Sequence, residues 1–217
     1  LSTALRGLQA QQPAFSSAVR LAKRWIASQM LLNFMEEEVV EMIVASLFVD
    51  STMYGMPSVN EAAATSTSKC AVDWVGPMSP QVAFLRFLQL VACYDWNAQP
   101  LIINFNDGLS TEELRHIDSS VSAKRAQHPV SLVLVTPYDH SGIAFTRENP
   151  AKPVWSRLMV LAHESLKLLE HQLMSPNHSL MEIGQSFRPP LEVYDALIHL
   201  NRAAIARRLY TLDARPT

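Results

Sequence analysis

Three basic side chains are the residues of this sequence that could do chemistry together. Arg20 and Arg24 are four residues apart, which is about one helical turn, and Lys23 lies beside them. Guanidinium and ammonium groups gathered on one face of a helix can hold phosphate groups. A solvated helix face that only keeps a protein soluble has the same composition, so both interpretations stay open at this point.

A second basic cluster lies near the end of the sequence and consists of Arg202, Arg207 and Arg208. It could also hold phosphates, but an exposed terminal segment explains it at least as well, because chain ends are often poorly ordered.

No complete enzyme site can be assembled from the sequence. The six glycines are isolated, so neither a dinucleotide-binding loop nor a P-loop is present. Asp139, His140 and Ser141 are the residue types of a hydrolase triad, but adjacent side chains point in different directions, and we expect a turn there.

Metal binding is not expected either. His163 and His171 are eight residues apart, which is about 12 Å along a helix and too far for one ion. Together with Glu164 and Glu170 they predict the polar face of a helix.

The composition is that of an ordinary globular chain of 217 residues, with 48% hydrophobic and 18% charged residues. A net charge of −2 means that any contact with nucleic acid must be local. No apolar run is long enough to cross a membrane.

The two cysteines, Cys70 and Cys93, favour a reducing compartment, and we expect a loop thiol and a core thiol. Because an initiating methionine and a secretory signal are both missing, we expect an excerpt from a longer protein.

The first half of the chain predicts three core helices. An apolar period runs through 15–30, with the basic residues outside the apolar stripe. The acids at 36–38 introduce a second helix, since negative charge suits a helix N-terminus. Residues 50–79 predict a long loop, and Ser79 followed by Pro80 begins a third helix, in which Val82 is among the residues expected to be buried.

The second half predicts a small α/β unit that begins near Asn97. Residues 101–105 and 130–135 read as strands, and Ser110 with Glu113 forms a capping box for the helix between them. A long amphipathic helix follows over 155–173, and 193–200 favours a strand.

Several segments also resemble, in order and spacing, one known family. They cover nearly the whole chain except 51–76, and they are 15–25, 41–48, 84–88, 94–96, 100–102, 135–139 and 187–195. The family is the nucleolar RNA-associated protein (Nrap) family, also called the nucleolar protein six family.

The resemblance implies an α+β fold, with a helical poly(A)-polymerase/oligoadenylate-synthetase-like domain followed by a small α/β domain. The helical domain would span 1–98, with a mobile insertion at 51–76, and the α/β domain would span 99–217 and be truncated. The first helix is also similar to a helix of oligoadenylate synthetases and poly(A) polymerases whose lysine contacts the nucleotide triphosphate, and Lys23 occupies that position.

The function that the resemblance implies is a non-catalytic scaffold subunit of the small-subunit processome, the 90S pre-ribosome. It would act in the nucleolus in pre-rRNA processing and ribosome biogenesis, with pre-ribosomal RNA and other processome proteins as partners and with no membrane and no cofactor. Arg20, Lys23 and Arg24 are the expected contacts to RNA or nucleotide phosphates.

Catalysis is not expected, because nucleotidyl transfer needs a Gly-Ser turn and clustered carboxylates that hold two metal ions. The sequence has no Gly-Ser pair and no carboxylate pair alternating with apolar residues on a strand. Two alternatives remain: a nucleotidyltransferase whose catalytic carboxylates lie in an upstream module, or a pure protein-interaction module.

Overall fold

The computed structural model describes residues 1–49, 77–105, 108–110, 112–113, 116–117, 121, 130–147, 150–174, 184–191, 195–196 and 198. The fold over these residues is mostly helical, with one short parallel sheet. In chain order the elements are α1 (Ser2–Gln11), α2 (Pro13–Ser28), η1 (Leu32–Phe34), α3 (Glu37–Ser46), α4 (Pro80–Cys93), β1 (Leu101–Ile102), β2 (Leu134–Val135), α6 (Lys152–Met174) and η3 (Gly184–Phe187).

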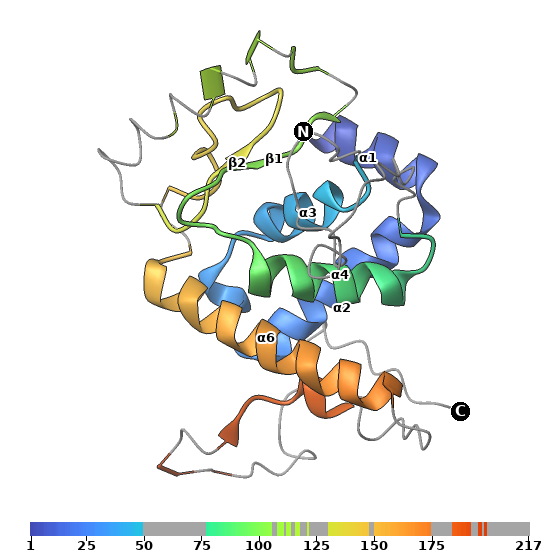
Figure 1. The fold of residues 1–217 in the computed structure, drawn as a ribbon, viewed down its shortest axis with the longest axis vertical. Helices are drawn as coiled ribbons and strands as arrows, with labels where there is room; N and C mark the ends of the chain where they lie inside the picture. The colour runs from blue at the N-terminus through green and yellow to red at the C-terminus, as the bar shows by residue number, and fades with distance from the viewer. Residues whose placement is uncertain are drawn as a thin grey trace, which may run out of the picture.

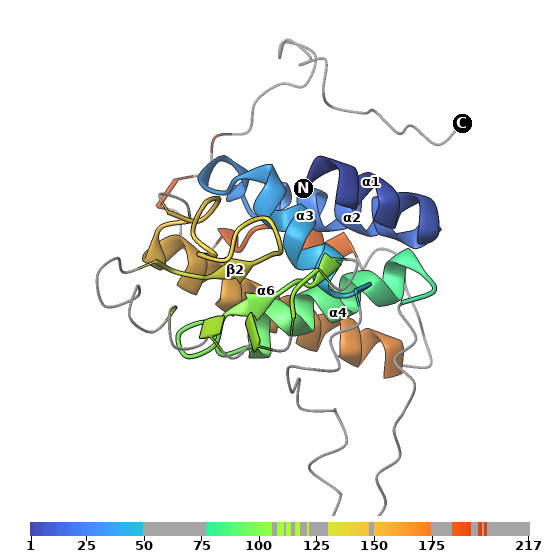
Figure 2. The ribbon, with the colours of Figure 1, turned by 90° about the horizontal axis from the view of Figure 1, so that it is seen from above.

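Helix α2 lies at the centre of the helical part, since α1, α3, α4, η1 and η3 all contact it. Figure 2 shows α1 and α2 on one side of the molecule and α4 on the other. The helix predicted over 15–30 is confirmed, and it begins slightly earlier at Pro13, because proline suits the first helical turn. Every position of its predicted apolar stripe is buried: Phe15, Ala18, Val19, Ala22, Trp25 and Ile26.

Trp25 fixes how three helices meet. Its side chain is fully buried, and its ring lies 6.2 Å from that of Phe87 on α4 in an edge-to-face arrangement. Its indole Nε1 donates a hydrogen bond to Ser165 Oγ on α6, at 3.1 Å. A buried N–H without a partner is costly, so this bond constrains the register of α6 against α2.

The end of α2 reverses the chain sharply. Met30 adopts a left-handed conformation with φ 61°. Its N–H donates to Ala27 O at 3.0 Å, and the N–H of Leu31 donates to Ile26 O at 3.2 Å. These two bonds form a Schellman motif, which closes the helix and allows α3 to begin only a few residues later.

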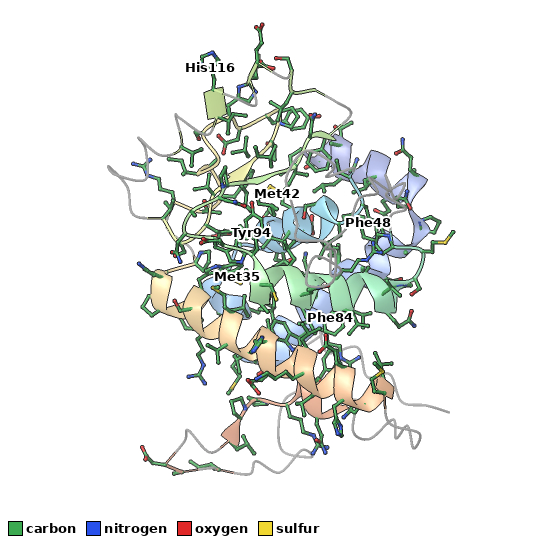
Figure 3. All side chains as sticks on the ribbon, in the orientation of Figure 1. Met35, Met42, Phe48, Phe84, Tyr94 and His116 are labelled. Atoms are coloured by element: carbon green, nitrogen blue, oxygen red, sulfur yellow. The ribbon has the colours of Figure 1, made fainter. Side chains whose placement is uncertain are left out.

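Helices α3 and α4 begin as the sequence predicts. Glu37 and Glu38 occupy the first turn of α3. Ser79 caps α4 by accepting a hydrogen bond from the Val82 N–H at 3.2 Å, and Pro80 occupies the first turn. Figure 3 shows Met42 of α3 and Phe84 of α4 among the helices, where both side chains are buried, whereas His116 lies at the outer edge.

Two predictions on α4 are wrong. Cys93 was expected to be a core thiol and Val82 a core residue, but both are exposed, Val82 at 42%. The two positions are eleven residues apart, close to three full turns, so they share one face of the helix. The buried face of α4 lies on the other side and includes Phe87, Leu88 and Val91.

Helix α6 runs beside α4 in Figure 1 and contacts it along much of its length. The long amphipathic helix is therefore confirmed, with Trp155, Leu158, Ala162 and Leu169 buried. Leu173, the last residue of the predicted amphipathic range 155–173, is 57% exposed near the end of the helix. In the described part of the chain, none of the helices has the length and apolar character needed to span a bilayer.

The parallel sheet separates two apolar clusters. Leu101 pairs with Leu134, and both side chains join the helical core. Ile102 pairs with Val135, and both join a smaller cluster with Leu109, Ile117 and Val121. Successive side chains of a strand point to opposite faces, so each short strand contributes to both clusters.

The core is continuous across the predicted boundary between residues 98 and 99. Trp96 and Trp155 pack edge to face with ring centroids 5.0 Å apart. The largest apolar cluster includes residues from α1 through α6. The division into a helical domain at 1–98 and an α/β domain at 99–217 stays a prediction. The predicted insertion at 51–76 lies wholly outside the described residues, and the predicted strand at 193–200 lies largely outside them.

The predicted capping box is confirmed. The Glu113 N–H donates to Ser110 Oγ at 3.3 Å, and the Ser110 N–H donates to Glu113 Oε2 at 2.7 Å. The hydrogen bond from the Ser110 N–H, followed by that of the Ser110 side chain, stabilises the charged carboxylate and lowers the pKa of Glu113.

Replacing Ser165 with alanine is expected to lower the free energy of unfolding by about 1–3 kcal/mol, because the buried indole N–H of Trp25 loses its acceptor. Chemical denaturation measures the loss. In a Trp25→Phe background, which has no indole N–H, the same Ser165→Ala change should cost clearly less. An equal cost in both backgrounds would show that the hydrogen bond does not stabilise the helix junction.

Gly142 cannot carry a side chain without strain. Its φ is +68°, and an added Cβ would clash with Val133 Cγ1 and lie 2.9 Å from Val135 Cγ2. Gly142→Ala is therefore expected to cost roughly 2–4 kcal/mol of unfolding free energy. Gly7→Ala is the matched control, because a Cβ added at Gly7 in α1 has no atom within 4 Å. We expect this change to raise the free energy of unfolding by about 0.5–1 kcal/mol. Equal effects at the two glycines would contradict the packing argument.

Candidate nucleic-acid interface

Arg20 and Arg24 lie on the outer face of α2, and both are exposed. The opposite face of the helix is held in the core by Trp25 and its apolar neighbours. One guanidinium nitrogen of Arg20 donates to Ser17 Oγ at 3.1 Å, one turn earlier on the same helix. The two arginines are therefore presented to solvent from a rigid support, as the sequence predicts.

Lys23 is placed differently from the arginines. Its side chain is only 21% exposed, and its Nζ donates to Glu37 Oε2 and to Glu41 Oε1, each at 2.7 Å. Glu37 and Glu41 are one turn apart on α3, so both carboxylates reach the same ammonium group. We call Glu37 and Glu41 the glutamate pair.

The charge of Lys23 is stabilised by this arrangement. Partial burial by itself lowers the pKa of Lys23, but the hydrogen bonds and charges of Glu37 and Glu41 outweigh it, and the pKa lies above its ordinary value of 10.5. Lys23 is therefore fully protonated at physiological pH and joins α2 to α3.

The structure thus separates the three predicted contacts into two kinds. Arg20 and Arg24 face solvent, whereas Lys23 is bound by carboxylates. The sequence interpretation missed this role, since it assigned Glu37, with the other acids at 36–38, only to the helix dipole and gave Glu41 no role. The available signal was the spacing of Glu37 and Glu41, which predicts that both face one neighbour of α3.

The Asp139 segment is a turn, as predicted. Asp139 Oδ1 accepts from the Ser141 N–H at 2.9 Å and also from the Ser141 hydroxyl, and Oδ2 accepts from the Ala144 N–H at 2.9 Å. The carboxylate thus caps its own loop. No triad geometry is seen in this turn, because Ser141 donates directly to Asp139 and the side chain of His140 is exposed.

The polar face predicted on the long helix is confirmed. His163, Glu164, Glu170 and His171 are all exposed on α6, and Glu164 pairs with Lys167 at 3.0 Å. Within the described residues, no three histidine, cysteine or acidic side chains are arranged to hold a metal ion. The second basic cluster, Arg202, Arg207 and Arg208, lies outside the part that the structure describes.

Comparison with known proteins decides the family. A family model described as "Nrap protein PAP/OAS1-like domain 5" matches residues 12–189. The chain belongs to this family. It is also 40% identical over 214 residues to "Nucleolar protein 6" of Homo sapiens, with 99% of this chain and 17% of the relative covered.

Other relatives carry the same name. The "Nucleolar protein 6" of Xenopus laevis is 41% identical over 215 residues, and that of Drosophila virilis is 32% identical over 213 residues. The alignments cover 98% and 96% of this chain, and 17% and 16% of the relatives. The chain therefore spans about a sixth of the length of these curated relatives. Their shared name agrees with the nucleolar location expected from the sequence, and the single family match runs across residue 98.

Lys23→Met is expected to lower the free energy of unfolding by about 1–2 kcal/mol near neutral pH, because the ion pairs are partly shielded from water. The pKa of Lys23 is raised in the folded state, so its stabilisation is complete below 10.5 and is lost as the pH rises through the folded-state value. Urea unfolding of both proteins at neutral and strongly alkaline pH measures this.

Lys167→Met provides the control, because Lys167 and Glu164 form an exposed pair with side chains 57% and 59% accessible. Its loss should cost only about 0.2–0.5 kcal/mol. A difference between wild type and Lys23→Met that persists unchanged at high pH would contradict the ion-pair explanation.

Proposed function

We propose that this chain is part of a non-catalytic scaffold subunit of the small-subunit processome, acting in ribosome biogenesis in the nucleolus. In this proposal Arg20 and Arg24 contact backbone phosphates of pre-ribosomal RNA. Lys23, the third predicted contact, can bind a phosphate fully only by giving up its glutamate partners. Neighbouring processome proteins contact the remaining surface.

One observation carries the RNA part of the proposal: two exposed arginines lie one turn apart on a helix whose other face is fully buried. Guanidinium groups form charge-assisted, bidentate hydrogen bonds with phosphate. Because the backbone of α2 is fixed by Trp25, little of that binding energy is spent on ordering the helix itself.

The overall charge favours a local contact over a broad one. With a net charge of −2, the chain has no large positive field to attract RNA from a distance. Phosphate contacts of this kind position an RNA and do not read its sequence. That behaviour suits a scaffold, which must hold RNA in place while other factors supply recognition.

The non-catalytic part of the proposal rests on the sequence, which has no Gly-Ser pair and no alternating carboxylate pair of the kind that nucleotidyl transfer needs. Incubating the full-length protein with labelled nucleoside triphosphates, an RNA primer and magnesium tests it. We expect no chain extension. Extension that disappears in a Lys23→Met protein would overturn the proposal in favour of an enzyme.

Reversing both arginines, Arg20→Glu and Arg24→Glu, is expected to weaken binding of a single-stranded RNA oligonucleotide about a hundredfold. Each lost contact is worth about tenfold, or ~1.4 kcal/mol. The loss should be similar for unrelated RNA sequences, and the slope of log affinity against log salt should become shallower by about 1.4. Fluorescence anisotropy over a range of salt concentrations measures both quantities.

The matched control reverses two exposed basic residues elsewhere, Arg6 on α1 and Arg157 on α6, and so makes the same change in net charge. If this control weakens binding as much as the α2 variant does, the contact is not specific to α2. Crosslinking from positions 20 and 24 in purified pre-ribosomes then distinguishes RNA neighbours from protein neighbours.

A further inference from the structure

The glutamate pair accepts hydrogen bonds from the ammonium group of Lys23, as a bound phosphate would. Two carboxylate oxygens lie 2.7 Å from Nζ, the short distance of charge-assisted hydrogen bonds. An ammonium group has three donors, and two of them are used here. A phosphate that approached Lys23 could therefore use only the third donor unless it displaced a carboxylate, and it would meet a group whose single positive charge is already exceeded by two carboxylate charges.

The electrostatic balance of the site depends on this pairing. Arg20, Lys23 and Arg24 carry three positive charges, and Glu37 and Glu41 carry two negative charges that lie against Lys23. Repulsion from the two carboxylates grows in proportion to the charge of the incoming anion. The attraction of the two arginines grows in the same proportion. The glutamate pair therefore lowers the binding of a tripolyphosphate, which carries several charges, by more than it lowers the binding of a phosphodiester, which carries one.

The charges of Arg20 and Arg24 are not neutralised by the glutamate pair, which contacts Lys23. In the described part of the chain, neither Arg20 nor Arg24 forms an ion pair with a carboxylate, although Arg20 donates to the Ser17 hydroxyl. A ligand bound by Arg20 and Arg24 contacts two guanidinium donors and lies near the negative charge of the glutamate pair. That pattern suits a chain of separate, singly charged phosphates better than one compact polyanion.

Resting on the proposed function, we infer that Glu37 and Glu41 determine the specificity of the interface. They hold Lys23 away from bound anions, restrict phosphate binding to Arg20 and Arg24, and so favour an RNA backbone over a triphosphate. The pair is also a structural link between α2 and α3, so its two roles must be separated by experiment.

The experiment uses the 217-residue chain with Glu37→Gln and Glu41→Gln, which keep the side-chain shape and remove the charge. Two probes are titrated: a single-stranded RNA oligonucleotide and inorganic tripolyphosphate. We expect RNA affinity to rise about tenfold, which is the value of one added phosphate contact, and tripolyphosphate affinity to rise more, about thirtyfold. The salt slope for RNA should become steeper by about 0.7. Circular dichroism and thermal unfolding verify that the variant is folded.

Two further proteins make the result specific. Glu36→Gln with Glu38→Gln removes the same charge from the same helix start, where neither residue forms an ion pair with a described residue, and it should change both affinities far less. Adding Lys23→Met to the Glu37→Gln, Glu41→Gln protein should abolish the gain. The inference is overturned if affinity does not rise, if the gain survives without Lys23, or if the 36/38 control gains as much.

Failure of the proposed function would look different. If the wild-type chain binds no RNA, or if reversing Arg20 and Arg24 leaves RNA binding unchanged, the RNA contact is wrong. The tripolyphosphate titrations still test the glutamate pair in that case. The rate at which Lys23 reacts with an acylating reagent gives a second readout that needs no ligand: it should rise when Glu37 and Glu41 are neutralised and stay constant in the 36/38 control.

Discussion

The burial of Trp25 is the constraint on which the rest of the structure depends. A fully buried indole brings a large apolar surface into the core, but its N–H must find an acceptor there. Ser165 supplies that acceptor from a helix 140 residues later in the chain, and Phe87 packs against the ring from α4. Three helices from distant parts of the sequence are thereby fixed around one side chain.

The arrangement of charges on the outer surface of α2 follows from the burial of Trp25. Because one face of α2 is fixed in the core, the residues on its other face have defined directions. Arg20 and Arg24 point to solvent, while Lys23 lies at the edge of the buried face, where α3 passes. The Schellman turn at Met30 brings α3 back along α2, and Glu37 and Glu41 then meet Lys23. One helix thus carries two cations that face solvent and one that joins it to α3.

The sheet links this helical core to the second half of the chain. Its strands are too short to form an independent layer, and they are stable because each contributes side chains to two apolar clusters. The approach of Gly142 to Val133 and Val135 then closes the outer side of β2, with the Leu134 N–H donating to Gly142 O at 2.9 Å. In the described residues, the sheet is therefore packed onto the helices and contributes to their core.

The sequence by itself determined what depends on neighbours along the chain. Periodicity located α2, α3, α4 and α6 but not α1. Ser79 and the Ser110–Glu113 capping box marked two helix starts, because capping is a local interaction, and ordered motifs identified the family. The tertiary structure alone decided which cations remain accessible, that Cys93 faces outward, and that the core crosses residue 98. Those outcomes depend on which helix faces which, and contacts such as Trp25 with Ser165 join residues too far apart for any local pattern to record.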